Sequence, residues 1–325
     1  MPLASTILMI RPAAFGFNEE TAANNYFQSN PGIGKEDPIA IGLQQKALAE
    51  FDNMVQTLRS HEIDVLVIED SKEPAKPDAI FPNNWLSTSP DGIVSVFPMY
   101  APNRRIEKRN EIIEQIAKEF VIRDVQDWSE YEAEGRFLEG TGSMVIDYDN
   151  KMIYACVSER TSLPVLEKYA ATNGYQAIAF LATDKNGMPV YHTNVVMTLG
   201  ENFCVLCEEA IDEEWELIAV RQLLESTNHN IIAITREQMH QFAGNMLQVK
   251  NNPRLNDKVG QASTGSGGEK FLIMSQTAFN SLRKEQKQML EAYATLLPIA
   301  VPTIEEVEGG SVRCMMAEVF LERKS

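Results

Sequence analysis

The sequence predicts an α/β fold in which five ββαβ units close into a ring, a five-bladed β/α propeller with pseudo-fivefold symmetry. Three observations predict it. Short β-rich runs bounded by Gly, Asn, Asp and Pro alternate with longer amphipathic helical runs. The starts of corresponding strands recur at a near-constant period, with 58, 52, 51 and 69 residues separating Asn84, Gly142, Asn194, Asn245 and Cys314. The fifth unit is divided between the two ends of the chain, and joining these ends would protect the sheet edges.

Four units lie within the chain, each with an opening strand, a turn, a return strand and a helix. The opening strands are expected at residues 82–86, 140–146, 192–197 and 243–247, and the return strands at 93–97, 152–157, 203–207 and 271–274. The helices are expected at about 105–118, 163–172, 213–226 and 279–295, and closing strands at 176–181, 231–234 and 298–301. Because the turn recurs about six to eight residues after each start, we favour the ring over its alternative, one large open mixed sheet.

The fifth unit pairs residues 314–321 with residues 6–11, followed by a helix near 39–59 and a strand at 65–68. Two segments interrupt the repeat, residues 14–37 and residues 253–270. The second is glycine-rich, which predicts a flexible loop. Its glycines are not arranged in the residue pattern of a phosphate-binding loop. Whether either segment acts as a lid is open. We expect one domain over residues 1–325.

Composition predicts an ordinary soluble globular protein, with 44% hydrophobic and 23% charged residues among 325. The formal net charge of −17 argues against nucleic-acid binding, because phosphate contacts depend on Lys and Arg. Residues 1–12 have no basic n-region, and their apolar run is too short to span a membrane. We therefore expect a first strand there, a cytoplasmic protein and no membrane partner.

The four cysteines, Cys156, Cys204, Cys207 and Cys314, show no disulfide-framework spacing. Cys204 and Cys207 have the spacing of a zinc or redox motif but lie in a strand-like run, where residues three apart face opposite sides. No second cysteine pair or histidine pair stands nearby in the sequence to complete a metal site. We expect two structural cysteines there, and neither a metal nor a cofactor.

Cys314 differs from the other cysteines because it lies beside Arg313 where a strand begins. Taken alone, it fits a buried structural cysteine better than a nucleophile. Equivalent strand starts in a ring should point into one shared region, which would also receive Glu139 and His192 from two other units. A thiol, an imidazole and a carboxylate are the parts of an activated cysteine nucleophile, so their common place in the repeat favours a catalytic site. The same reasoning adds the residues at the other strand starts, Asn84, Asn194 and Asn245.

Five motifs resemble those of the guanidino-group-modifying superfamily, the penteins, whose members include arginine deiminases, dimethylarginine hydrolases and amidinotransferases. They are Phe81-Pro82-Asn83-Asn84-Trp85, Phe137-Leu138-Glu139-Gly140-Thr141-Gly142, Ser158-Glu159-Arg160-Thr161, His192-Thr193-Asn194 and Arg313-Cys314-Met315. The likeness extends from Thr6 to Leu321 and is greatest toward the branch of amidinotransferase-like or citrulline utilisation hydrolases. The resemblance implies a five-bladed β/α propeller.

The resemblance also implies a role for each matching residue. Cys314 would attack the central carbon of a guanidino or ureido group, and His192 would act as general acid and then activate water. Glu139 would orient and charge-stabilise His192, or bind the substrate nitrogens. Arg160 would grip a substrate carboxylate, which suits its fork, and Asp78 would lie near the α-amino end.

Departures from the deiminase pattern bear on the substrate. Deiminases carry Asp where this chain has Asn84 and Asn194, and their Glu-Gly-Gly-Asp motif loses its second acid in residues 139–142. A buried guanidinium without its paired carboxylates would be uncompensated, at roughly 3–5 kcal/mol per broken pair. An amide can both donate to and accept from a neutral ureido group. We therefore expect a cysteine-dependent hydrolase, with citrulline as the best substrate, cleaved to ornithine, ammonia and carbon dioxide through a covalent thioester.

Two alternatives stay open. The first is an arginine deiminase or amidinotransferase that acts through an amidino-cysteine, since sequence cannot show whether water or an amine takes up the group. The second is a non-catalytic propeller that serves as a binding module, against which the joint presence of Cys314, His192 and Glu139 argues. Arg313 is either a pocket residue or a surface charge, and Asn245 either lines the pocket or holds a turn. In the enzyme interpretations the partner is a small amino-acid substrate.

Overall fold

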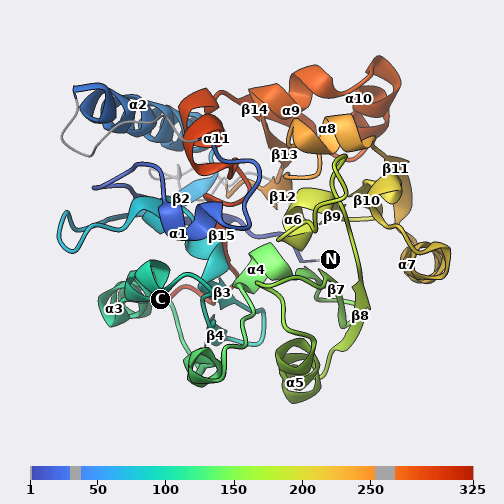
Figure 1. Cartoon of the computed structure of the whole chain (residues 1–325), viewed down its shortest axis with the longest axis horizontal. Coiled ribbons are helices and arrows are strands. Elements are labelled where there is room, and N and C mark those ends of the chain that lie inside the picture. Colours follow the sequence, from blue (N-terminus) through green and yellow to red (C-terminus); the bar gives the residue numbers. More distant parts are fainter. Residues whose placement is uncertain (1, 30–37, 253–267, 325) are drawn as a thin grey trace, which may run out of the picture.

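The chain has a mixed α/β fold with five three-stranded sheets, seen in a computed structural model that describes residues 2–29, 38–252 and 268–324 (Figure 1). The sheets, each with its first, middle and third strand, are β15 (Ala317–Val319), β1 (Thr6–Arg11) and β2 (Asp64–Glu69); β3 (Leu86–Thr88), β4 (Ile93–Val96) and β5 (Asp124–Asp127); β6 (Val145–Asp147), β7 (Met152–Cys156) and β8 (Gln176–Phe180); β9 (Met197–Gly200), β10 (Phe203–Leu206) and β11 (Asn230–Ala233); and β12 (Leu247–Lys250), β13 (Lys270–Ser275) and β14 (Thr295–Ile299). In every sheet the middle strand pairs antiparallel with the first strand and parallel with the third.

Each parallel pair needs a crossover connection, and helices supply it in all five sheets. The crossover helices are α2 (Pro38–Ser60), α3 (Asn110–Glu119), α5 (Leu163–Asn173), α7 (Glu214–Ser226) and, in the last sheet, α9 (Gln276–Ser281) with α10 (Lys284–Glu291). In Figure 1 these helices lie around the rim, whereas first strands of neighbouring sheets contact one another, β15 with β3, β6 with β9 and β9 with β12. The predicted ββαβ order is confirmed in each unit, including the one divided between the chain ends.

The remaining helices are short. The α-helices are α1 (Glu19–Ala22), α4 (Gly140–Ser143), α6 (Thr193–Val196), α8 (Arg236–His240) and α11 (Pro302–Glu308). The 3-10 helices are η1 (Pro77–Ile80), η2 (Pro82–Asn84), η3 (Pro102–Glu107), η4 (Ser129–Glu134) and η5 (Glu208–Ala210). Of the helices that the structure describes, none combines the length and the apolar character needed to cross a bilayer.

The predicted opening strands at 82–86, 140–146 and 192–197 begin too early. A helical turn occupies each start, formed by η2, α4 and α6, and the strands β3, β6 and β9 follow it. Turns also precede β12 and β15, where the amide of Asn245 donates to the Phe242 carbonyl and that of Cys314 to the Ser311 carbonyl, both at 2.9 Å. These local bonds satisfy the backbone without a neighbouring strand, so residues that were expected on strands are presented by turns instead.

Two predicted helices also need correction. The helix expected at 105–118 begins at Asn110, because Lys108 and Arg109 leave helical geometry with ψ of 80° and 122° and separate it from η3. The helix expected at 279–295 is divided into α9 and α10, because Leu282 and Arg283 are extended, with ψ of 136° and 158°. The last closing strand therefore begins at Thr295, three residues earlier than expected.

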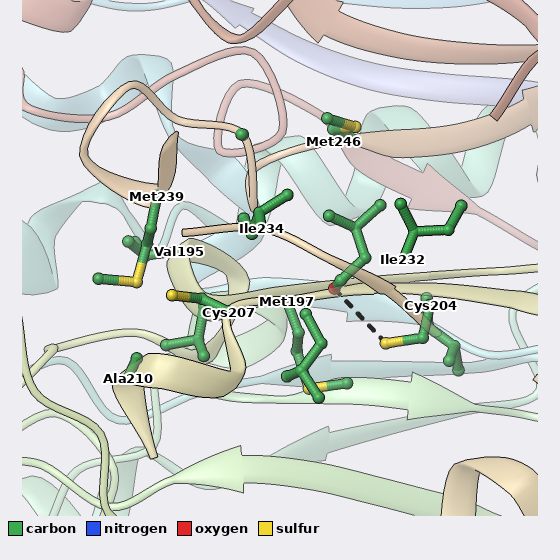
Figure 2. Close-up of a cluster of buried hydrophobic side chains, with 14 of the residues drawn as sticks. Val195, Met197, Cys204, Cys207, Ala210, Ile232, Ile234, Met239 and Met246 are labelled. Atoms are coloured by element: carbon green, nitrogen blue, oxygen red, sulfur yellow. Dashed lines mark hydrogen bonds between the residues drawn. The ribbon is translucent and has the colours of Figure 1, made fainter. Parts of the chain in front are cut away.

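Cys204 and Cys207 belong to a buried apolar cluster around the β9-β10-β11 sheet (Figure 2). Both side chains are fully buried, and the Cys204 thiol donates to the Val205 carbonyl at 3.5 Å. Burial raises the pKa of both thiols, that of Cys207 to about 12. Within the described ranges, no group of three or more His, Cys, Asp or Glu side chains is arranged to hold a metal ion. The pair packs as apolar side chains would.

Candidate active site

A narrow cavity lies where the turns before β3, β9 and β15 meet. Five of the residues predicted for the site line it: Asp78, Asn84, Arg160, His192 and Cys314. Other lining residues were not predicted: Asn25, Phe81, Arg104, Tyr191, Glu308 and Gly310. Of these five, Asn84, His192 and Cys314 were expected together from the common position of the strand starts, whereas Asp78 and Arg160 were expected from the family resemblance.

His192 and Glu139 form a buried pair. The His192 ring Nε2 lies 2.8 Å from Glu139 Oε2, and Glu139 Oε1 accepts from the amide of Tyr100 at 2.9 Å. Burial alone would raise the pKa of Glu139, but Arg160, at 3.7 Å, and His192 together lower it to about 2. Burial lowers the pKa of His192 to about 4, against the opposing effect of Glu139. At neutral pH the pair is therefore a carboxylate and a neutral imidazole.

Cys314 is 5% exposed and receives two amide donors. The side-chain nitrogens of Asn245 and Asn194 lie 3.4 Å and 3.6 Å from its sulfur. Asn245 also donates to the Asn194 carbonyl at 3.0 Å and accepts from the amide of Arg313 at 3.0 Å. Asn245 thus connects the turns that precede three strands, and its N–H, like that of Asn194, is directed at the atom that would carry charge in a thiolate.

Asn84 and the Gly140–Ser143 turn pack against each other closely. Asn84 donates to Asn83 Oδ1 at 3.1 Å, and its own Oδ1 accepts from Arg104 at 2.8 Å. A Cβ on Gly142 would lie 2.6 Å from Asn84 Nδ2 and 2.9 Å from the His192 ring. The glycine in this motif therefore leaves the space in which the amide and the imidazole come together.

Arg104 is a cavity residue that the sequence analysis missed. It is 2% exposed, and its Nε and Nη2 contact the two oxygens of Glu107, each at 2.9 Å. Its Nε also lies 3.4 Å from Asp78 Oδ2. Burial raises the pKa of Glu107 to about 7, against the opposing effect of Arg104. The available signal was the Arg104–Glu107 spacing of three, which is also typical of an ion pair on an exposed helix face.

Arg160 is held by the described part of the segment 14–37, which interrupts the unit divided between the chain ends. Its Nε donates to Asn24 Oδ1 at 2.8 Å, its Nη2 donates to the Thr21 carbonyl at 2.9 Å, and its guanidinium lies 4.7 Å from the Tyr191 ring centroid. In the same segment Asn25 donates to the Glu308 carbonyl at 2.9 Å. Asn25 therefore lines the cavity itself, and Thr21 and Asn24 hold the Arg160 side chain that lines it.

The Arg313 side chain does not reach this cavity. Its guanidinium donates to the Met316 carbonyl at 2.8 Å and pairs with Glu318 at 3.0 Å. With Asn194 and Thr141 it lines a second cavity. Both interpretations left open for Arg313 are therefore wrong. The residue does not line the cavity that contains Cys314, and it is not an exposed surface charge, because it is 8% exposed.

A family model described as N,N dimethylarginine dimethylhydrolase, eukaryotic, matches residues 11–321. No curated protein sequence matches this chain significantly. Among solved structures, the substrate-bound N-terminal domain of ArgZ, an arginine dihydrolase from the ornithine-ammonia cycle in cyanobacteria, has a TM-score of 0.68 at 16% identity, and each chain is covered to 98%. A dimethylarginine dimethylaminohydrolase adduct with S-methyl-L-thiocitrulline has a TM-score of 0.63 at 18% identity, with 98% of this chain and 100% of that chain covered.

The apo structure of ArgZ gives a TM-score of 0.69 at 16% identity over 98% of this chain. This chain spans only 40% of the length of that structure. The match to the family model covers nearly the whole chain, and the motifs around Cys314, His192 and Glu139 lie within it. This chain belongs to the N,N dimethylarginine dimethylhydrolase family and, with it, to the guanidino-group-modifying (pentein) superfamily.

Proposed function

We propose that this chain is a cysteine-dependent hydrolase of the guanidino or ureido group of an arginine-like amino acid, with citrulline as its best substrate. One observation carries the proposal. Cys314 and the His192–Glu139 pair meet at one buried cavity, where the groups near the sulfur and at Asn84 are amides rather than carboxylates. This arrangement combines a nucleophile, a proton carrier and neutral hydrogen-bonding groups.

In the proposed reaction, Cys314 attacks the ureido carbon. The His192 Nε2–H donates to ionised Glu139, so the neutral ring has Nδ1 free to take the thiol proton. His192 then gives this proton to the departing δ-amine, which releases ornithine and leaves a carbamoyl thioester on Cys314. Next, His192 takes a proton from water as the oxygen attacks the thioester. The thiol is restored, and the carbamic acid breaks down to ammonia and carbon dioxide.

The substrate-binding proposal assigns the remaining cavity residues. Asn84 and Asn194 would bind the planar head of the substrate, because their amides can both donate and accept. Asn245 would act through the Cys314 sulfur and the Asn194 carbonyl that it contacts. Arg160 would bind the α-carboxylate through Nη1, which lies 3.7 Å from Glu139 Oε2 and beyond hydrogen-bond distance of it, since its Nε and Nη2 already donate to Asn24 and the Thr21 carbonyl. Asp78 would lie at the α-amino end.

Arginine is a second candidate substrate, and two observations favour it. Two buried carboxyl groups, Asp78 and Glu308, line the cavity, and structures of arginine dihydrolases resemble this fold. With arginine, Cys314 would carry an amidino group, as in a deiminase or an amidinotransferase. A non-catalytic binding module is the third possibility. It predicts that a thiol-directed alkylating agent does not label Cys314 selectively. The other three cysteines, Cys156, Cys204 and Cys207, are fully buried and should not compete for the label.

We further propose that the five sheets are the blades of a closed propeller and that residues 1–325 form one domain. The contacts between neighbouring first strands and the pairing of β15 with β1 across the chain ends support this arrangement. We also propose that the chain belongs to the citrulline-directed branch of the superfamily and that the protein is cytoplasmic.

The direct test is a substrate screen with the purified protein. Citrulline, arginine, agmatine and methylated arginines are incubated with enzyme, and ornithine, other amines and ammonia are measured. We expect ornithine from citrulline, and no activity in Cys314→Ser. Turnover of arginine without turnover of citrulline would overturn the neutral-substrate proposal and leave the cysteine-dependent reaction standing.

A further inference from the structure

The Asn84 side chain lies on the cavity, and a buried arginine fixes the orientation of its amide. Arg104 Nη1 donates to Asn84 Oδ1 at 2.8 Å. A guanidinium can only donate, so the atom beside Nη1 must be the amide oxygen and not the amide nitrogen. The nitrogen Nδ2 has two hydrogens and donates one of them to Asn83 Oδ1 at 3.1 Å. Among the described residues, the second N–H of Asn84 is therefore the donor that remains for a ligand.

Carboxyl groups on the other side of Arg104 keep its guanidinium in place. Its Nε and Nη2 donate to the two oxygens of Glu107, each at 2.9 Å, and Nε also lies 3.4 Å from Asp78 Oδ2. A bidentate pair of this kind fixes the plane of the guanidinium and, with it, the direction of Nη1. Arg104 therefore supports the Asn84 amide as a rigid group.

The Asn84 nitrogen lies beside the proton carrier of the proposed reaction. A Cβ added to Gly142 would stand 2.6 Å from Asn84 Nδ2 and 2.9 Å from His192 Nδ1, so both nitrogens border the same small space. His192 Nδ1 is the atom that takes the thiol proton in the proposed reaction, and Cys314 lines the same cavity. The remaining N–H of Asn84 is consequently near the place where the head group would be attacked.

We propose that Arg104 is a positioning residue that holds the Asn84 N–H against the carbonyl oxygen of a ureido head group, where Asn84 stabilises the negative charge that develops on this oxygen. The inference rests on the proposed function for the identity of the substrate. As the Cys314 sulfur bonds to the ureido carbon, the C=O bond becomes a C–O⁻ bond and the thiol proton passes to His192. The C=O bond forms again when the bond to the δ-nitrogen breaks and this nitrogen takes the proton. A donor fixed beforehand at the oxygen, with a cation behind it, favours this intermediate.

This arrangement selects the head group by its hydrogen-bonding pattern. A ureido group has an oxygen that accepts, whereas every nitrogen of a guanidinium donates and none accepts. A guanidinium would therefore place an N–H against the N–H of Asn84 and leave a buried donor without a partner, which is costly. The favoured substrate class is thus an amino acid whose head group carries an acceptor on the central carbon.

Infrared difference spectroscopy of bound citrulline tests this contact without turnover. Cys314→Ser is mixed with citrulline that is isotopically labelled at the ureido carbon, and the carbonyl band of the bound ligand is recorded. Hydrogen bonding to the oxygen lowers the C=O frequency, so adding Asn84→Leu should move the band to higher frequency. Arg104→Lys should move it in the same direction, because one ammonium group cannot contact Glu107 and Asn84 as the planar fork does. Combining the two changes should give the band of Asn84→Leu alone, since Arg104 acts through Asn84.

The matched control is Arg313→Lys, which changes a buried arginine outside this cavity and should leave the band unmoved. In the enzyme with Cys314 intact, Asn84→Leu should lower kcat for citrulline by about a hundredfold or more. Failure of citrulline to bind, or a band that Asn84→Leu does not move, would overturn the inference even if Arg104→Lys fails to fold. An unmoved band together with ornithine formation would leave the proposed function standing. A band that responds as expected, without ornithine from the wild type, would instead overturn the proposed reaction alone.

Discussion

Replacement of Asn84 by aspartate tests why this cavity should prefer a neutral head group. Asn84 Oδ1 accepts from Arg104 at 2.8 Å, and aspartate would keep that contact. The change falls on Nδ2, which now donates to Asn83 Oδ1 at 3.1 Å and becomes an acceptor with negative charge. The site is 3% exposed, so water screens this charge little.

A charge-assisted hydrogen bond contributes about 1.5–3 kcal/mol, which corresponds to a change of roughly 10–150-fold. We therefore expect Asn84→Asp to lower the ratio of kcat/KM for citrulline to kcat/KM for arginine by at least about tenfold. Combining it with Asn194→Asp should lower the ratio further. It should also slow both reactions, because Asn194 Nδ2 lies 3.6 Å from the Cys314 sulfur.

The assay measures ornithine and ammonia from each substrate in the wild type, both single variants and the double variant. Asn202→Asp makes the same chemical change at an exposed hairpin position and serves as the control. An unchanged citrulline-to-arginine ratio in the double variant, with both substrates still turned over, would refute the charge argument.

Three further predictions follow from the geometry. Gly142→Ala places a Cβ 2.6 Å from Asn84 Nδ2, so kcat should fall about a hundredfold, whereas Gly42→Ala, with no atom within 4 Å of the added Cβ, should leave it unchanged. Because burial holds the pKa of His192 at about 4 rather than 6.5, the unfolded chain takes up the proton first. His192 should therefore lower the free energy of unfolding by up to about 3 kcal/mol between pH 6.5 and 4, measured in denaturant titrations as the difference between the wild type and His192→Asn, because Glu107, with its raised pKa, contributes in the opposite direction in both proteins. Arg160→Gln should raise KM more than it lowers kcat. The Arg313 guanidinium pairs with Glu318, so Arg313→Gln should lower thermal stability and leave KM unchanged. The reverse pattern would contradict both assignments.

The repeat in the sequence predicted the strand order in every unit because strand–turn–strand–helix–strand spacing is a local property. It also predicted that Cys314 and His192 meet, since equivalent positions of equivalent units face a common region. It did not predict that turns such as Gly140–Ser143 precede the strands, because a single helical turn has too few residues for a periodic signal.

Side-chain direction set the limit of the prediction within the site. Arg313 adjoins Cys314 in the sequence, yet its guanidinium points to Glu318 in a second cavity. Arg104 has the spacing of an exposed ion pair with Glu107 but is buried, because it also contacts Asp78, 26 positions earlier in the chain. Such long-range neighbours fix burial, and no local pattern encodes them.

The most direct test of the central claim is mass spectrometry of enzyme quenched with acid during turnover. Enzyme mixed with citrulline should carry a carbamoyl group on the peptide that contains Cys314, and ornithine should appear in the same sample. A His192 variant that slows hydrolysis should accumulate this adduct. Ornithine release without any adduct, an adduct on another cysteine, or full activity in Cys314→Ser would contradict the assignment of Cys314 as the nucleophile.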